Sequence, residues 1–411
     1  MHAKSLLLAS VVLLAIAAQA QYQYTVLHAF GSGDDGAGAW SSVAFDSQGN
    51  LYGTTEAGGT YSDGTVFQLS PQTNGAWSET ILHNFPSSSD DGVSPYAGMA
   101  PGPSGSLYGA TQLGGTYRAG VAFELTRAAS GWDYGVVYSF GAPDTLVCCP
   151  RGNLIVGPGN SLYGTGYAAF ELSPGPDGWV EGILHNFTGL NGDGLGPEAG
   201  PIMDATGNLY GTTLYGGGGG CDDGCGTVYQ LETPVGTWSK SPAWRERILH
   251  RFGEAPDDGA FPGVGELAID GHGNLYGTAD TGGTGRGGIV YKLVRTSAAP
   301  GGVWAEVILH NLAPDGLGYE PGGGVIIDSA GNLYGTTING GSPFCGCGVV
   351  YKLSPQPDGQ WQYTLLHTFV GSDGAQPDAN LTIGPDGNLY GTAAAGGAYG
   401  GGVVFQIQIA P

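Results

Sequence analysis

Six of the eight histidines occupy one position in a repeated segment, and histidine is the side chain best suited to acid–base chemistry and metal binding near neutral pH. They lie in β-like runs such as that from Trp77 to Phe85, which we interpret as the outermost strand of each repeat. In the third repeat Ser139 takes the place of the histidine. Because histidines spread around a perimeter do not converge, we predict hydrogen bonding within or between repeats and no metal site. The six are His28, His83, His185, His250, His310 and His367.

Asp-Gly pairs form the second recurrent group. We place them in loops that lead from the outermost strand of one repeat to the innermost strand of the next. Carboxylates among exposed aromatic rings suit contact with a glycan or peptide, and oxygen-rich loops can hold Ca²⁺. The alternative is that Asp-Gly makes a tight turn each time. The candidate ligand-binding residues are Asp35, Asp91, Asp193, Asp258, Asp315, Asp373, Trp40, Tyr96, Tyr61 and Tyr117, with Asp144 at the matching place in the third repeat.

We identify no histidine as a candidate for acid–base catalysis. Six of the histidines lie in outer strands, His2 lies in the leader and His272 lies in a turn between inner strands. No nucleophile motif, phosphate loop or dinucleotide fingerprint occurs. A glycosidase-like reaction uses a pair of carboxyl groups, and repeats supply these at many spacings by chance. We therefore predict no catalytic residue. The alternative is an enzyme that uses a pair of carboxyl groups drawn from Glu56, Glu198, Asp280 and Glu320.

Six cysteines fall in loops that we expect on the same face as the Asp-Gly pairs. In an exported chain, disulfides are favoured over zinc, although a four-thiolate zinc site is the alternative. Cys221 with Cys225 would staple one loop, and Cys345 with Cys347 would close a small ring. The disulfide candidates are Cys148, Cys149, Cys221, Cys225, Cys345 and Cys347.

A Leu-Tyr-Gly phrase recurs seven times, as at Leu51 to Gly53 and Leu389 to Gly391, with its tyrosines 47 to 66 residues apart. Each repeat holds four short β-like runs separated by turn residues, and no segment has a sustained helical period. Glycine makes up 80 of the 411 residues but does not recur at every third position, as it would in collagen. We therefore expect most glycines to lie in turns. These features predict an all-β fold, a seven-bladed β-propeller of four-stranded antiparallel blades.

The phase of the repeat predicts how the ring closes. After the leader, the first strand, residues 22–30, has the sequence pattern of the fourth, outermost strand of a repeat. The last strand of the chain has the pattern of the third strand. The N-terminal strand would complete the last blade and remove its open edge. We expect one propeller over residues 21–411, with blades at about 41–85, 97–140, 153–187, 200–252, 265–312, 323–369 and 379–407 plus 22–30.

The sequence around these phrases resembles a known family. Gly-Asn-Leu-Tyr-Gly-Thr-Thr, then Gly-Gly, then Gly-Thr-Val-Phe-Gln-Leu and Ile-Leu-His-Asn-Phe is similar to the GloVer (Gloeo/Verruco) tandem repeat of exported bacterial proteins. The resemblance covers nearly all of residues 22–407. It implies a repeat scaffold and carries no established activity. The third repeat departs most, with a shortened loop around Gly164 to Gly166.

Residues 1–20 have the order of a secretory signal peptide: Lys4, an apolar run from Leu6 to Ala18, and a small-residue end at Ala20. We expect cleavage near Ala20, a secreted, periplasmic or cell-envelope location, and no transmembrane anchor. The net charge of −23 repels nucleic acid and anionic membranes, so neither is expected as a partner.

The sequence supports three hypotheses for function. The first is an exported binding or surface-interaction module, a monomer, whose acidic and aromatic loop face contacts a glycan, peptide or protein. The second is a carbohydrate-active or lyase-type enzyme that uses carboxylates at the channel mouth. The third is a structural envelope scaffold. No cofactor is expected. Ca²⁺ is the exception that we keep as an alternative, because the oxygen-rich loops could bind it.

Overall fold

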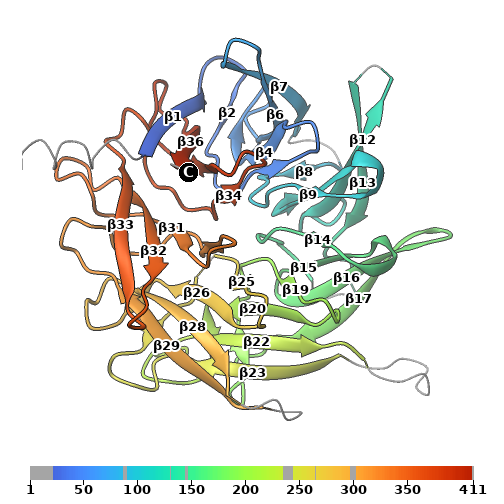
Figure 1. The fold of residues 1–411 in the computed structure, drawn as a ribbon. Coiled ribbons are helices and arrows are strands. Elements are labelled where there is room, and N and C mark those ends of the chain that lie inside the picture. The colour runs from blue at the N-terminus through green and yellow to red at the C-terminus, as the bar shows by residue number, and fades with distance from the viewer. Residues whose placement is uncertain are drawn as a thin grey trace, which may run out of the picture.

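Seven four-stranded antiparallel sheets surround a central axis in the computed structural model, which describes residues 22–86, 90–129, 131–143, 147–234, 244–263, 265–296 and 302–409 (Figure 1). The prediction of an all-β, seven-bladed propeller is confirmed. The expected signal peptide and Asp144 lie outside the described residues. Within them the helical elements are two short 3-10 turns, η1 (Pro103–Gly105) and η2 (Pro158–Asn160). No helix in this part of the chain is long and apolar enough to cross a bilayer.

Each blade runs from a two-residue innermost strand at the axis to a long outermost strand at the perimeter. The first four blades, in that order of strands, are β3 (Ala44–Phe45), β4 (Leu51–Thr55), β6 (Thr65–Pro71) and β7 (Trp77–Asn84); β9 (Ala100–Pro101), β10 (Leu107–Thr111), β12 (Val121–Ala128) and β13 (Gly131–Ser139); β14 (Ile155–Val156), β15 (Leu162–Thr165), β16 (Ala168–Gly175) and β17 (Gly178–Asn186); and β19 (Ile202–Met203), β20 (Leu209–Thr213), β22 (Thr227–Glu232) and β23 (Arg245–Arg251). The last three are β25 (Ala268–Ile269), β26 (Leu275–Ala279), β28 (Ile289–Arg295) and β29 (Trp304–Asn311); β30 (Ile326–Ile327), β31 (Leu333–Thr337), β32 (Val349–Pro355) and β33 (Trp361–Thr368); and β34 (Thr382–Ile383), β35 (Leu389–Ala393), β36 (Val403–Ile409) and β1 (Tyr22–Ala29).

The ring closes through the N-terminal strand, as predicted from the phase of the repeat. β1 pairs antiparallel with β36, with Tyr22 opposite Ile409 and Ala29 opposite Val403. In Figure 1 the dark blue β1 lies beside the red β36 as the outermost strand of the seventh blade. This pairing covers an edge that would otherwise present free backbone N–H and C=O groups.

The repeated tyrosines and tryptophans pack between blades, as predicted. Asp46, in the turn between the two inner strands, accepts hydrogen bonds from the backbone N–H of Asn50 and from the Tyr52 hydroxyl, both at 2.9 Å. These bonds orient the buried Tyr52 ring, and Trp132 of the next blade meets its edge at 5.7 Å between ring centroids. Equivalent edge contacts join Trp77 to Tyr390, Trp179 to Tyr108 and Trp244 to Tyr163.

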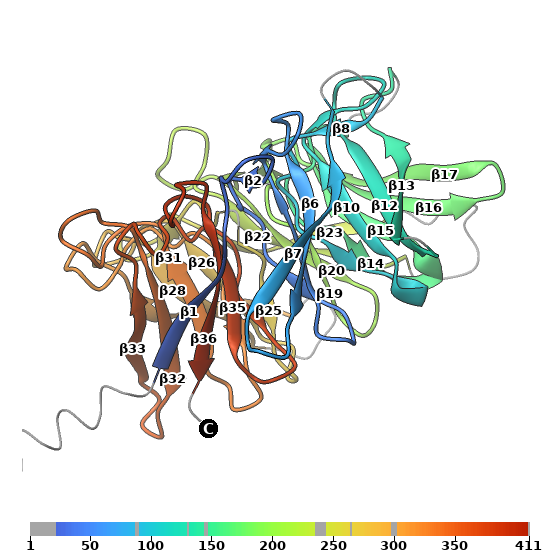
Figure 2. The same ribbon diagram turned by 90° about the horizontal axis from the view of Figure 1, so that it is seen from above.

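The loops that enter each blade and the loops between its two middle strands share one face of the ring. In four blades they pair as short two-stranded sheets, and β2 and β8 lie along the upper face in the side view of Figure 2. The shortened third blade has no such sheet among its described residues. The pairs are β2 (Gly36–Ala37) with β5 (Ala57–Gly58), β8 (Gly92–Val93) with β11 (Leu113–Gly114), β18 (Gly194–Leu195) with β21 (Tyr215–Gly216), and β24 (Gly259–Ala260) with β27 (Thr281–Gly282).

Candidate functional site

A repeated backbone kink brings each entry loop to the axis. In six blades the residue before the loop proline has a positive φ, which costs a non-glycine residue about 1–2 kcal/mol. In the first blade Ala39 stands in place of the proline, and Gly38 before it has the positive φ. Two backbone hydrogen bonds hold the kink: the Ser94 N–H donates to the carbonyl of Asp63 in the preceding blade, and its carbonyl accepts from Gln112, both at 3.1 Å. The kinks fall at Gly38 (φ 72°), Ser94 (55°), Cys149 (59°), Gly196 (68°), Phe261 (58°), Glu320 (56°) and Gln376 (57°).

Beyond the kink, the residue four places before each innermost strand faces the axis, and we call this set the axial ring. Its side chains differ from blade to blade although the backbone around them repeats. Most of them, with residues two places before the same strands, line a cavity of about 250 Å³. Lining segments from six blades can meet only on the axis. The described members of the axial ring are Trp40, Tyr96, Arg151, Glu198, Gly322 and Asp378.

Glycines and asparagines close the floor beneath this ring. A Cβ on Gly265 would overlap the backbone nitrogen of Gly324, so neighbouring entry segments touch through their backbones. The Asn153 carbonyl oxygen accepts from Gly98 N–H at 2.5 Å, and its amide donates to the Ser42 hydroxyl at 2.8 Å, so one side chain joins three blades. Floor and walls are therefore fixed before any ligand arrives.

An aromatic pair forms one wall of the pocket. The rings of Trp40 and Tyr96 lie 6.3 Å apart with 26° between their planes. The Arg151 guanidinium lies 5.3 Å from the centre of the Tyr96 ring and forms an ion pair with Glu198 at 3.1 Å. The arrangement offers a flat apolar surface beside hydrogen-bonding groups in fixed positions.

Carboxyl groups gather in and beside the pocket: Glu198, Glu266 and Asp378 line it, and Asp280 lies near Glu198 and Asp378 without lining it. Burial raises the pKa of Asp280 to about 8, with the charges of Asp378, Glu320 and Glu198 adding to the effect. Burial and Glu198 raise the pKa of Asp378 to about 7, and burial raises that of Glu266 to about 7 against a hydrogen bond from Asn153. Asp378 also has a buried Oδ1 without a hydrogen-bond partner in the described structure. At neutral pH the carboxyl groups in the pocket therefore include both proton donors and proton acceptors.

The aspartates of the Asp-Gly pairs point to the blade seams and not to the axis. Five of the six accept a hydrogen bond from the histidine of their own blade, as in His83 to Asp91 at 2.8 Å, so hydrogen bonding of the histidines is confirmed. Of the predicted aromatic residues, Trp40 and Tyr96 line the pocket, whereas Tyr61 and Tyr117 are exposed on outer loops. The other histidine pairs are His28 to Asp35 at 3.1 Å, His185 to Asp193 at 3.2 Å, His250 to Asp258 at 3.4 Å and His367 to Asp373 at 3.0 Å.

The assignment of Ser139 to the histidine position is wrong. Tyr138 pairs with Ala122, as His83 pairs with Val66, and Ser139 takes the place of Asn84. Counting back from the buried Phe140, which matches Phe85, gives the correct alignment.

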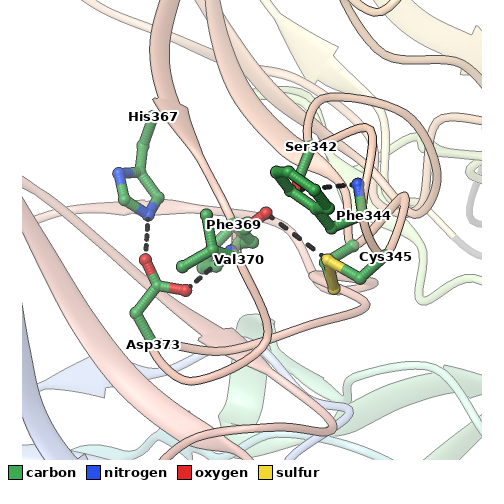
Figure 3. Close-up of a disulfide and its surroundings, with 8 residues drawn as sticks. Ser342, Phe344, Cys345, His367, Phe369, Val370 and Asp373 are labelled. Carbon is green, nitrogen blue, oxygen red and sulfur yellow. Dashed lines mark hydrogen bonds and ion pairs between the residues drawn. A yellow bond between two sulfur atoms is a disulfide. The ribbon is translucent and has the colours of Figure 1, made fainter.

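The cysteines form two loop disulfides, Cys221 to Cys225 and Cys345 to Cys347. Figure 3 shows the second beside the His367–Asp373 pair, where Asp373 also accepts from the Val370 N–H at 2.8 Å. Cys148 and Cys149 are free thiols. Burial raises the pKa of Cys148 to about 12, so little reactive thiolate is present at neutral pH.

Sequence reasoning named Glu198 and Asp280 but missed Arg151, Glu266 and Asp378. A signal was present: within the repeat, the residue after the loop proline changes from Tyr96 to Arg151 to Glu198 while its neighbours stay alike. Variation inside an otherwise regular repeat marks positions that the fold does not dictate.

The fold and this site define a seven-bladed β-propeller with a polar pocket on its axis. The chain belongs to the Gloeobacter/Verrucomicrobia repeat family, whose model matches residues 12–176 and 298–411, more than half of the sequence. No curated protein matches it.

Solved propellers are similar in fold. An ancestral GH74 enzyme is 13% identical with a TM-score of 0.58, over 94% of this chain and 51% of that one. A putative 6-phosphogluconolactonase from Bacteroides uniformis is 13% identical with a TM-score of 0.48, over 91% and 89%. A putative oxidoreductase (glucose dehydrogenase) from Thermus thermophilus is 14% identical with a TM-score of 0.41, over 94% and 100%. At this identity the likeness concerns the fold alone.

Proposed function

We propose that the protein is a carbohydrate-binding propeller and that its ligand enters the axial pocket. The observation that carries the proposal is that the Trp40–Tyr96 wall and carboxyl and amide groups line the same cavity of about 250 Å³. Sugar rings present an apolar face for an aromatic wall and hydroxyls for planar polar groups. The volume lies just below the ~300–1,000 Å³ usual for ligand pockets, so one sugar ring or the end of a chain fits best.

A glycan is favoured over an anionic ligand by the charge of the pocket. Among the described residues of the lining, Arg151 is the one basic side chain, and Glu198 already pairs with it. A phosphate or carboxylate would meet the Glu198, Glu266 and Asp378 carboxyl groups without a free cation to offset them. A neutral, hydroxyl-rich ligand avoids this repulsion and can both donate to and accept from these groups.

The test is binding of the mature chain to an array of glycans, followed by calorimetry with the best ligand. Trp40→Ala is expected to weaken binding at least ~10-fold, about 1.4 kcal/mol, because it removes half of the aromatic wall. Tyr117→Ala is the matched control: it removes an exposed aromatic ring from an outer loop and is expected to bind as the wild type does. Equal losses in both variants, or no glycan bound, would overturn the proposal.

A second candidate is acid–base cleavage of the bound glycan, favoured by the raised pKa of Asp378, which lines the pocket, and of Asp280, which lies beside it. A carboxylic acid protonated near pH 7 is what a glycosidase needs for its general acid. Asp280→Asn and Asp378→Asn keep the shape of the side chains and remove the exchangeable carboxyl proton. Loss of turnover with binding retained supports this candidate, and absence of turnover by the wild type on every bound glycan removes it.

Export places the pocket where extracellular glycans occur. The signal-like residues 1–20 support export, and the two loop disulfides are typical of oxidising compartments. N-terminal sequencing of the protein from a culture fluid or periplasmic fraction tests this, with cleavage near Ala20 as the expected result.

A further inference from the structure

Three blade seams bring a histidine, an aspartate and a glutamate together. In each, the histidine and aspartate come from one blade and the glutamate from the outermost strand of the next. One ligand atom from each of the three side chains lies within 4.8 Å of the other two. We call these the Glu seams, and they are His28, Asp35 and Glu79; His185, Asp193 and Glu246; and His250, Asp258 and Glu306.

The spacing of these atoms suits a small metal ion. The histidine Nε2 lies 3.1, 3.2 and 3.4 Å from the aspartate oxygen and 3.5, 3.5 and 3.7 Å from the glutamate oxygen in the three Glu seams. In a tetrahedral zinc site with bonds of about 2.0–2.2 Å, neighbouring ligand atoms lie roughly 3.3–3.6 Å apart. All six distances fall close to the edges of such a tetrahedron.

Within the described residues the glutamate carboxyl groups also lack hydrogen-bond donors, and in Glu79 and Glu306 the oxygen concerned is the one nearest the histidine Nε2. Glu79, Glu246 and Glu306 each have a buried Oε1 without a hydrogen-bond partner in the described structure. Each carboxyl group also faces the aspartate of its own seam, so two acidic groups share a poorly hydrated space. Such a pair requires a proton or a cation between its members. A divalent ion would balance both negative charges at once.

Three other seams of the same chain form an internal comparison, because a tyrosine stands where the Glu seams have glutamate. Tyr134 stacks on His83 with centroids 3.7 Å apart and donates its hydroxyl proton to Asp91. Tyr24 stacks on His367 in the same way, and Tyr363 on His310 at 4.7 Å. In these tyrosine seams the ring covers the imidazole and no second carboxylate is introduced. The His–Asp distances there are 2.8 and 3.0 Å, shorter than in any Glu seam.

We propose that each Glu seam is a binding site for a divalent transition metal ion of the Zn²⁺ type, held by the imidazole and two carboxylates and bridging two blades. Imidazole with carboxylates selects such ions over Ca²⁺, which prefers six to eight oxygens. A water molecule would complete the coordination. Arg251 lies close to Glu246 and competes with the ion for its charge, so this site is expected to be the weakest of the three.

The seam between blades two and three is a built-in control. Glu181 stands at the glutamate position there and also has a buried, unpartnered Oε1. Its facing residue is Tyr138 instead of a histidine. Without an imidazole this seam is expected to bind no metal.

The experiment titrates Co²⁺ and Zn²⁺ into the untagged, metal-stripped mature chain at pH 7.5. Visible absorption reports tetrahedral Co²⁺, and calorimetry reports the stoichiometry. Three ions per chain are expected, the last binding most weakly. Because Cys148 and Cys149 are free thiols, the titration is repeated in C148S/C149S, where the stoichiometry is expected to stay at three.

Glu→Tyr variants test the sites without emptying the seams, since the chain itself uses tyrosine at three equivalent positions. E306Y is expected to bind two ions, the E79Y/E246Y/E306Y variant none, and E181Y three. Zn²⁺ is expected to raise the melting temperature of the wild type and not of the triple variant. A wild type that binds no Co²⁺, or a folded triple variant that binds as many ions as the wild type, would overturn the proposal and leave a shared proton as the occupant of the Glu seams.

Discussion

Tyr22 lies directly opposite Ile409, so the first and last described residues of the chain are paired across one antiparallel ladder. This pairing makes the seventh blade a composite of both ends. Every blade of the closed ring consequently packs against two neighbours.

Deletion of residues 22–30 is expected to reopen that blade. The variant loses the outermost strand that covers β36 and exposes its edge, so its melting temperature is expected to fall by at least ~10 °C and its transition to broaden. Shortening the exposed turn at residues 72–75 is the control, with little change expected. Circular dichroism on heating gives both results, and a truncated chain that melts like the full one would refute closure by β1.

Because backbones are in close contact at the axis, replacing a glycine there is expected to lower stability far more than replacing a glycine in an open turn. Gly265→Ala puts a methyl group into the backbone of Gly324, and we expect a loss of about 3 kcal/mol of unfolding free energy. Gly271→Ala, in the same blade, meets nothing within 4 Å and has no positive φ, so it serves as the matched control. Chemical denaturation of both variants measures the difference. Equal stability of the two would contradict the closed floor of the pocket.

The stability of the metal-free protein is expected to peak in mildly acidic solution. Burial raises the pKa of Glu246 and Asp280 to about 8 and of Glu266 and Asp378 to about 7. Between about pH 4.5 and 8 the folded chain therefore holds protons that the unfolded chain releases, and stability falls as pH rises through this window.

The acidic side of the profile has a different cause. Burial alone would raise the pKa of Asp46, but hydrogen bonds from Asn50, Tyr52 and Gln48 hold it below its usual value. Its contribution is present above the unfolded pKa and is lost as pH falls through the lower folded one. Melting temperatures from pH 3 to 9 with a chelator check the profile. Glu246→Gln is expected to flatten the fall above pH 4.5, and stability that rises steadily to pH 8 would contradict the account. Asp204, Asp270, Asp328 and Asp386 behave as Asp46 does.

The fold was predictable because its determinants are repeated. The Leu-Tyr-Gly phrase occurs in all seven blades and the turn aspartate in five of them, so the same local structure is specified many times over. The offset of residues 22–30 indicates how the ring closes. The loop disulfide between Cys221 and Cys225 was one of the pairings that the sequence left open, and the structure forms it.

The pocket was harder to predict because its residues do not repeat. Trp40 and Tyr96 were identified as loop aromatics, yet their meeting with Asp378 depends on the backbone kinks before Pro95 and Pro377, which are visible only in three dimensions. The Glu seams were missed because each glutamate belongs to a different blade from its histidine, as Glu79 does from His28, and the contact across the seam is visible only in three dimensions.

The most direct test of the central claim is a crystal structure of the mature chain with the best glycan ligand from the array. We expect electron density for a sugar ring against Trp40 and Tyr96, with hydroxyls within hydrogen-bonding distance of Asp378 or Glu266. A ligand bound at the outer loops around Tyr61 and Tyr117, with the axial pocket empty, would contradict it.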